Sequence, residues 1–204
     1  MTYLTPSLVA SVVLSVLCLF LAGAVWSDLR DCRIPNRLVF AGASAGIAFN
    51  AVLPEGLGFA SALPGAIGFW NALAGLGLGL GLMLPLYLLR VMGAGDVKLI
   101  AMVGAFLGAR AIVGVVLATY IVGGMLILAV VLCNGTLGRL LTNLRTMLLS
   151  GFFKLVLREM PVVDAAPDSA ARMPYGAAIA AGTITYIALK SIGTDLPWFL
   201  AAFE

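Results

Sequence analysis

The sequence predicts an all-α polytopic membrane protein with about six transmembrane helices, and its composition and its length lead to this fold class. The chain has 204 residues, of which 62% are hydrophobic and 10% are charged, and its mean hydropathy is +1.12. Soluble domains carry about 25% charged residues, so this chain is too apolar to be one. Because a membrane span takes roughly 20 apolar residues, several spans account for most of the chain, and we expect a single membrane-embedded domain over residues 1–204.

Apolar runs give the positions of the predicted spans. They cover about residues 6–26, 38–53, 65–89, 97–109, 111–132 and 174–192. The first run has no basic residues before it and is too long for a cleaved signal peptide, so we expect it to be retained. The third run contains GLGLGLGL, with glycines spaced four apart, a spacing that favours close helix packing. The pairs are Gly75 with Gly79 and Gly77 with Gly81.

Lysine and arginine set the predicted orientation, because cytoplasmic loops of membrane proteins are enriched in them. Most of the 12 basic residues fall in three connections, at 27–37, around 90–98 and at 133–173. Only Arg110 and Lys190 lie on the other side. We therefore expect these three connections in the cytoplasm and both termini outside. The net charge of +3 is modest and dispersed, so we expect no nucleic-acid partner.

Residues 137–160 predict a cytoplasmic amphipathic helix that lies on the membrane surface. Polar and basic side chains recur there every three or four residues, which places them on one face of a helix. Anchoring on anionic lipid is one interpretation, and guiding a substrate or contacting assembly partners is the other. The PVVDAAPDSAARMP stretch after it predicts a loop.

The residue types rule out several kinds of catalytic site. The chain has no histidine, and its three cysteines, Cys18, Cys32 and Cys133, form no CxxC pair. A Ser-His-Asp or Cys-His site is therefore impossible, an HExxH zinc site is excluded, and three cysteines cannot fill a four-thiolate zinc site. We expect no metal.

Two carboxylates stand at helix ends on the same predicted side of the membrane. Asp28 follows the first span, and Asp96 opens the fourth. Ionisable groups near a bilayer are costly, so such a pair points to a functional site. The alternative is that both are solvated loop charges that end their helices. Asp31 is the rival to Asp28, and its place between Arg30 and Arg33 favours a solvated partner role.

A close pair of carboxylates has the chemistry for peptide hydrolysis. Two such groups within a few ångströms do not both ionise easily, so they hold one proton between them. The ionised member can take a proton from water as it attacks a carbonyl, while the protonated member hydrogen-bonds the carbonyl oxygen. Gly93 and Gly95 let the backbone come close to a bound peptide and permit positive φ before the helix. Asp96 can also cap the fourth helix.

Three ordered motifs carry a resemblance to a known family. GAGD followed by VKL, at 93–99, matches the GxGD signature of intramembrane aspartic peptidases in the GxGDxKL form of type IV prepilin peptidases. SDLRDCRIPNRL, at 27–38, resembles the first catalytic segment of these enzymes, and MPYGAAIAAG, at 173–182, resembles the opening of their last helix. Without a CxxC pair, the chain is most similar to the short form found in Flp/Tad pilus systems.

This resemblance implies an aspartic endopeptidase with Asp28 and Asp96 as its catalytic pair and with no cofactor. The implied substrates are prepilins or pseudopilins, whose short leader precedes a hydrophobic N-terminal helix. Cleavage would take place at the cytoplasmic face of the bacterial cytoplasmic (inner) membrane, where membrane lipids are the other partners. Methyltransferase activity belongs to longer members with two CxxC pairs, so we do not expect it here.

Further residues are expected to bind substrate or support the pair: Gly93, Gly95, Lys98, Arg33, Asn36, Pro174, Tyr175 and Gly176. Structural roles compete with these functional ones. Lys98 either snorkels to the interface or tunes the pKa of Asp96. Arg33 either orients Asp28 or only determines topology, and Asn36 either shapes a turn or hydrogen-bonds near the site. The PYG residues either line the substrate path, by resemblance, or form a tight helix start with an interfacial tyrosine.

Two other function classes stay open on the sequence alone. A small proton-coupled transporter would place its carboxylates at mid-membrane, whereas these lie at helix ends. A non-catalytic membrane component of a pilus or secretion machine would leave pilin length unchanged when either aspartate is replaced.

Overall fold

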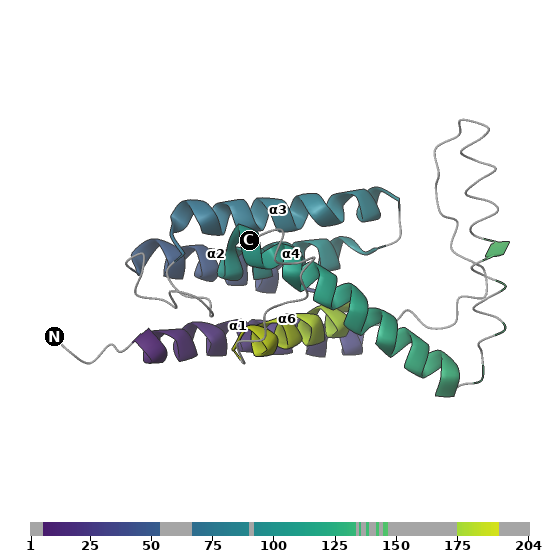
Figure 1. Ribbon diagram of the computed structural model, residues 1–204. Coiled ribbons are helices and arrows are strands. Elements are labelled where there is room, and N and C mark those ends of the chain that lie inside the picture. The colour runs from purple at the N-terminus through teal and green to yellow at the C-terminus, as the bar shows by residue number, and fades with distance from the viewer. Residues whose placement is uncertain are drawn as a thin grey trace.

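The described part of the chain is entirely helical. The computed structural model describes residues 6–53, 67–89, 92–133 and 175–191, with isolated positions at 135, 138, 142 and 145–146. These residues form α1 (Pro6–Asp31), α2 (Asn36–Val52), α3 (Phe69–Leu88), α4 (Ala94–Cys133) and α6 (Tyr175–Ser191). Figure 1 shows three tiers, with α1 beside α6 on one side, α3 on the other, and α2 and α4 between them. The all-α prediction is confirmed over these residues.

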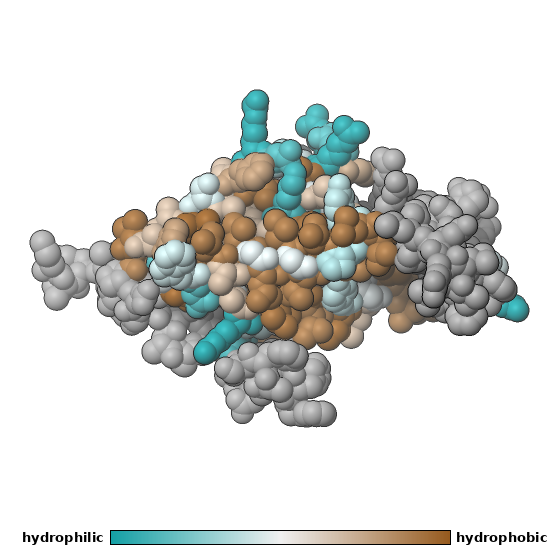
Figure 2. Space-filling model, turned by 90° about the horizontal axis from the view of Figure 1, so that it is seen from above, coloured by the Kyte–Doolittle hydropathy of each residue, from teal (hydrophilic) through white to brown (hydrophobic). Residues whose placement is uncertain are grey.

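Helix length and composition support a membrane protein. Three helices are long and apolar enough to cross a membrane, namely α1 from Ser11 onward, α3 and α4. Helices α2 and α6 have 17 residues each, which is at the lower end of the length that spans a hydrocarbon core. Figure 2 shows a mostly apolar surface on the described face, with hydrophilic residues toward its margins. Six crossings are therefore not confirmed and stay a prediction.

Helix α4 contains a break at Gly108, close to the turn predicted between the fourth and fifth spans. Gly108 has φ 84° and ψ 175°, a conformation that favours glycine because it has no Cβ. Gly79 of α3 approaches Ile100 on one side of the break and Ile112 on the other. Both halves of α4 therefore pack along α3, and Leu99–Gly108 is buried throughout.

Two asparagine side chains satisfy backbone groups at this break. The Asn50 amide of α2 donates hydrogen bonds to the carbonyls of Ala105, at 3.0 Å, and Phe106, at 3.3 Å. The Asn71 side-chain oxygen of α3 accepts a hydrogen bond from the Ala109 N–H at 3.2 Å. Unpaired backbone groups are costly where water is absent, so these amides stabilise the break by hydrogen-bonding backbone groups that lipid cannot.

The glycine-rich helix α3 packs closely on α4 along one face only. The Gly75 backbone contacts that of Gly104, and a Cβ on Gly79 would lie 3.0 Å from the Ile100 carbonyl oxygen. The prediction of close packing is confirmed for Gly75 and Gly79. It is wrong for Gly77 and Gly81, because no described residue lies within 4 Å of a Cβ added at either position. These two glycines sit on the opposite face of the helix.

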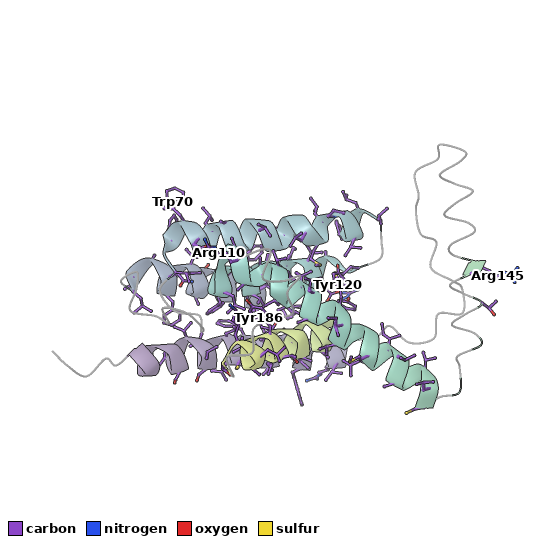
Figure 3. All side chains as sticks on the ribbon, viewed as in Figure 1. Trp70, Arg110, Tyr120, Arg145 and Tyr186 are labelled. Atoms are coloured by element: carbon purple, nitrogen blue, oxygen red, sulfur yellow. The ribbon has the colours of Figure 1, made fainter. Side chains whose placement is uncertain are left out.

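Helix α6 runs antiparallel to the second half of α4. Gly114 of α4 contacts the ring of Tyr186, Thr119 lies against Gly182, and Gly123 lies against Ala178. Figure 3 shows Tyr186 between the two helices. Residue numbers rise along α4 as they fall along α6, so the N-terminal end of α6 meets α4 near Gly123.

Candidate active site

Asp28 lies near the C-terminal end of α1, and its side chain is buried, with 7% of its surface exposed. Helix α1 ends at Asp31, and the next residue, Cys32, adopts a left-handed φ of 48°. The Cys32 N–H donates to the Asp28 carbonyl at 2.9 Å, and the Ser27 hydroxyl donates to the Arg33 carbonyl at 2.7 Å. These bonds fold the chain back immediately after Asp28.

The start of α6 approaches the Asp28 carboxylate closely. The Gly176 backbone N–H donates a hydrogen bond to Asp28 Oδ2 at 2.7 Å. A Cβ on residue 176 would lie 2.8 Å from the same oxygen, closer than a side chain can come without displacing the carboxylate. Glycine at this position therefore lets a backbone donor from a distant segment hold Asp28, and helix N-termini favour such contacts with anionic groups.

Asp96 lies in the first turn of α4 and caps that helix. Its carboxylate accepts a hydrogen bond from the Gly93 backbone N–H, which is the reaching-back half of a capping box. The predicted capping role is confirmed. The predicted positive φ is wrong for Gly93 and Gly95, because the described glycines with positive φ are Gly68, Gly108 and Gly135.

The carboxylates of Asp28 and Asp96 lie close enough for their charges to repel each other. Gly95 brings the two segments together, since a Cβ on it would lie 3.2 Å from Ile34 Cβ in the turn after α1. Asp31, in contrast, is exposed at the end of α1. The structure therefore brings together Asp28 and Asp96, the pair that sequence reasoning selected.

Lys98 links the start of α4 to the start of α2. Its Nζ donates to Asn36 Oδ1 at 2.9 Å and lies 5.9 Å from the centre of the Phe40 ring. The described contacts of its ammonium are thus with α2. These contacts favour a structural role for Lys98 and Asn36, while the Arg33 side chain is exposed.

Tyr175 opens α6 beside Gly176, and its side chain is half-buried. Its hydroxyl lies 3.9 Å from the position of a Cβ on Gly123. The phenol is also near enough to Asp96 for the charge of that carboxylate to act on it. Gly123 and Ile34 were not singled out from the sequence. No motif marks Gly123, and Ile34 lies inside the 27–38 motif, but only the fold shows its contact with Gly95.

Three sequence predictions fall on residues outside the described part of the chain. They concern Pro174, the loop after residue 160, and the amphipathic segment 137–160, of which only positions 138, 142, 145 and 146 are described, and these are helical. No three potential ligands among histidine, cysteine, aspartate and glutamate gather around one point within the described residues. The chemistry that the described site offers is therefore that of two neighbouring carboxylates, which suits transfer of protons to and from a reacting group.

Comparison with protein families matches residues 15–128 to the type IV leader peptidase family. No curated protein and no solved structure matches. The match includes both aspartates and ends before α6, which the structure nevertheless places on Asp28. More than half of the chain is covered, and the helices are apolar as a membrane peptidase requires. The chain therefore belongs to the type IV leader peptidase family, and it is a membrane peptidase.

Proposed function

We propose that this peptidase is an aspartic endopeptidase that removes the short leader of prepilins or pseudopilins, with Asp28 and Asp96 as its catalytic pair. The observation that carries the proposal is the convergence of three segments on Asp28. Asp96 comes from α4, and the Gly176 N–H comes from α6 at 2.7 Å. Membership in the leader peptidase family supports peptide hydrolysis over proton transport or a purely structural role.

In the proposed reaction, the two carboxylates share one proton because like charges at close range oppose double ionisation. The ionised carboxylate takes a proton from water, and the water oxygen bonds to the scissile carbonyl carbon. The carbonyl oxygen receives the proton of the other carboxyl group. The carboxyl group that took the proton from water then gives it to the amine nitrogen as the C–N bond of the gem-diol breaks, and one diol hydroxyl returns its proton to the other carboxylate as the C=O bond re-forms.

Three features support a site at the membrane boundary, and one of them, the arginines, favours the cytoplasmic side. Asp28 and Asp96 both lie at helix ends, and the exposed residues Arg30, Arg33 and Arg37 follow Asp28, which fits the enrichment of basic residues in cytoplasmic loops. Trp26 is 70% exposed, as expected for an aromatic residue at the membrane boundary. A leader bond just before a hydrophobic helix would meet the pair at this depth.

The substrate class follows from the resemblance to Flp/Tad-type peptidases. A prepilin of that kind has a short cytoplasmic leader and a hydrophobic N-terminal helix that lies in the inner membrane. We place this protein in the bacterial inner membrane with both termini outside, among lipids that surround its apolar surface (Figure 2).

The test is cleavage of a co-expressed Flp-type prepilin, read as the mass of the pilin. Replacing either member of an acid–base pair removes a proton-transfer step, so we expect Asp28→Asn and Asp96→Asn each to lower the cleavage rate by about 10³-fold or more. Asp31→Asn is the matched control, because Asp31 is exposed on the same helix. It should leave cleavage near wild type, and membrane insertion of all variants is followed in parallel.

Each contrary result has a defined meaning. Cleavage that persists in Asp28→Asn, together with loss in Asp31→Asn, would move the catalytic role to Asp31. A wild-type chain that leaves the leader in place would contradict the substrate assignment and favour the transporter or the non-catalytic component.

A further inference from the structure

The Tyr175 hydroxyl is a hydrogen-bond donor beside the carboxylate pair that the fold does not use. The residue begins α6, and its side chain is half-buried. Within the described part of the chain, its hydroxyl has no hydrogen-bond acceptor. The fold therefore leaves this donor available, and a bound substrate can supply its acceptor.

The neighbouring residue fixes where this phenol can lie. The Gly176 N–H is bonded to Asp28 Oδ2 at 2.7 Å, so the backbone next to Tyr175 is held against one member of the pair. The ring extends toward Gly123 of α4, with the hydroxyl 3.9 Å from the position of a Cβ there. The phenol is also close enough to Asp96 to interact with its charge. Gly176 therefore places one donor on Asp28, and Tyr175 places a second donor beside Gly123 of α4, in the same region as the carboxylate pair.

Tyr120 shows what a tyrosine without this role looks like in the same region. It lies on the second half of α4 (Figure 3), and its hydroxyl contacts Met83 Sδ of α3 at 3.8 Å. Its donor is directed to the α3 side of the molecule. Of the two tyrosines, only Tyr175 has a hydroxyl without an acceptor among the described residues.

We propose that Tyr175 is a third catalytic residue whose hydroxyl donates a hydrogen bond to the carbonyl oxygen of the scissile peptide bond. This inference rests on the proposed function above. As the water oxygen bonds to the carbonyl carbon, the C=O π electrons move to the carbonyl oxygen, and that oxygen takes its proton from the carboxyl pair. The Tyr175 O–H bond stays intact, and its hydrogen bond shortens as charge develops on the oxygen.

A donor with this placement acts on the transition state more than on bound substrate. The carbonyl oxygen carries more negative charge in the transition state, so the hydrogen bond stabilises it preferentially. Removing one such donor typically lowers kcat by about 10²-fold to 10³-fold. Because the Gly176 bond and the α4 contact hold the residue in place before substrate arrives, little reorganisation opposes this effect.

The test compares Tyr175→Phe with Tyr120→Phe in the full-length protein, using the same Flp-type prepilin in liposomes. We expect Tyr175→Phe to lower kcat by about 100-fold with KM changed by less than about threefold. Its affinity for a leader peptide that carries a hydroxyl-bearing carbon in place of the scissile carbonyl should fall in parallel, whereas its affinity for the cleaved leader should stay the same. Tyr120→Phe should keep kcat, KM and both affinities.

Three results would overturn the inference: an unchanged kcat in Tyr175→Phe, a loss confined to KM, or an equal loss in Tyr120→Phe. All three are read against a wild-type chain that cuts the prepilin and loses this activity in Asp96→Asn. If the wild-type chain does not cut, the proposed function itself fails and the role of Tyr175 falls with it.

Discussion

The two ends of the described bundle both bury polar side chains, but they use them in different ways. At the Gly108 break, the Asn50 amide makes three hydrogen bonds to backbone carbonyls, and its oxygen accepts one from the Ile67 N–H. At the other end, the described hydrogen bond of the Asp28 carboxylate comes from Gly176, and that of Asp96 comes from Gly93. A carboxylate has about four acceptor sites, so both aspartates keep capacity for water and substrate.

This difference separates a structural polar site from a chemical one. Asn50 has 2% of its surface exposed, and its hydrogen-bonding capacity is nearly used up, so it can only hold the break together. Among the described residues each aspartate has one backbone donor, and like charges on the two neighbouring carboxylates oppose double ionisation. We therefore expect substitutions at the break to change the free energy of unfolding, and substitutions at the carboxylate end to change the cleavage rate.

The largest effect in this comparison is expected at Gly176. In Gly176→Ala the new Cβ would lie 2.8 Å from Asp28 Oδ2, so the carboxylate or the start of α6 must shift. A misplacement of about 1 Å in a catalytic group can lower the rate about 100-fold, which corresponds to roughly 2.7 kcal/mol in the activation free energy. The measurement is the rate of prepilin cleavage in membranes.

Gly124→Ala is the matched control for this variant. Gly124 is also helical, and no described residue lies within 4 Å of a Cβ added to it, so its cleavage rate should stay near wild type. If Gly176→Ala cut at the wild-type rate, the close contact between α6 and Asp28 would have no part in catalysis, and the distinction between the two ends would lose its main support.

A smaller effect is expected at the break, and it concerns the free energy of unfolding instead of the cleavage rate. Asn50→Leu keeps the size of the side chain but leaves the carbonyls of Ala105 and Phe106 without their donors. Leaving buried acceptors unpaired costs about 1–3 kcal/mol, and we expect the free energy of unfolding in detergent to fall by about 2 kcal/mol. The cleavage rate of the folded fraction should be unchanged, because the break lies at the end of the bundle away from the aspartates.

Asn71→Leu is the reference variant with which the stability loss in Asn50→Leu is compared. Asn71 contributes one bond to the break, from the Ala109 N–H at 3.2 Å, and its side chain is exposed. Single interhelical hydrogen bonds in membrane proteins average about 0.6 kcal/mol, so its loss should be clearly smaller. An Asn50→Leu variant that unfolds like wild type but no longer cuts would reverse the roles assigned to the two ends.

The residues of the carboxylate end could be selected from the sequence, because they stand in ordered motifs. An aspartate at the end of an apolar run, GAGD at the start of another, and PYG before the last one predicted that Asp28, Asp96 and Gly176 would lie at one membrane face. What could not be predicted is how they meet. The contact of Gly95 with Ile34 and the bond from Gly176 to Asp28 join segments far apart in the chain, and no local pattern encodes such distances.

The break was only partly predictable. The boundary between the fourth and fifth apolar runs lies close to Gly108, but a glycine in a glycine-rich chain carries no signal that its φ is positive. Asn50 did carry a signal, since a lone amide at the end of the apolar run 38–53 is costly in a membrane and calls for a buried partner. That the partner is the broken backbone of α4 follows only from the fold.

A small effect is also expected at Lys98, which belongs to a site motif but makes contacts like those at the break. Its ammonium bonds Asn36 at 2.9 Å and lies over Phe40, so Lys98→Met should lower the free energy of unfolding by about 1 kcal/mol and the cleavage rate by less than about threefold. Asn36→Ala removes the same hydrogen bond, so the two losses should not add in the double variant. Additive losses would show that the bond is not formed in the membrane. A Lys98→Met variant that folds but does not cut would instead place Lys98 in the chemistry, because an ammonium that only joins α4 to α2 has no influence on the proton shared by the aspartates.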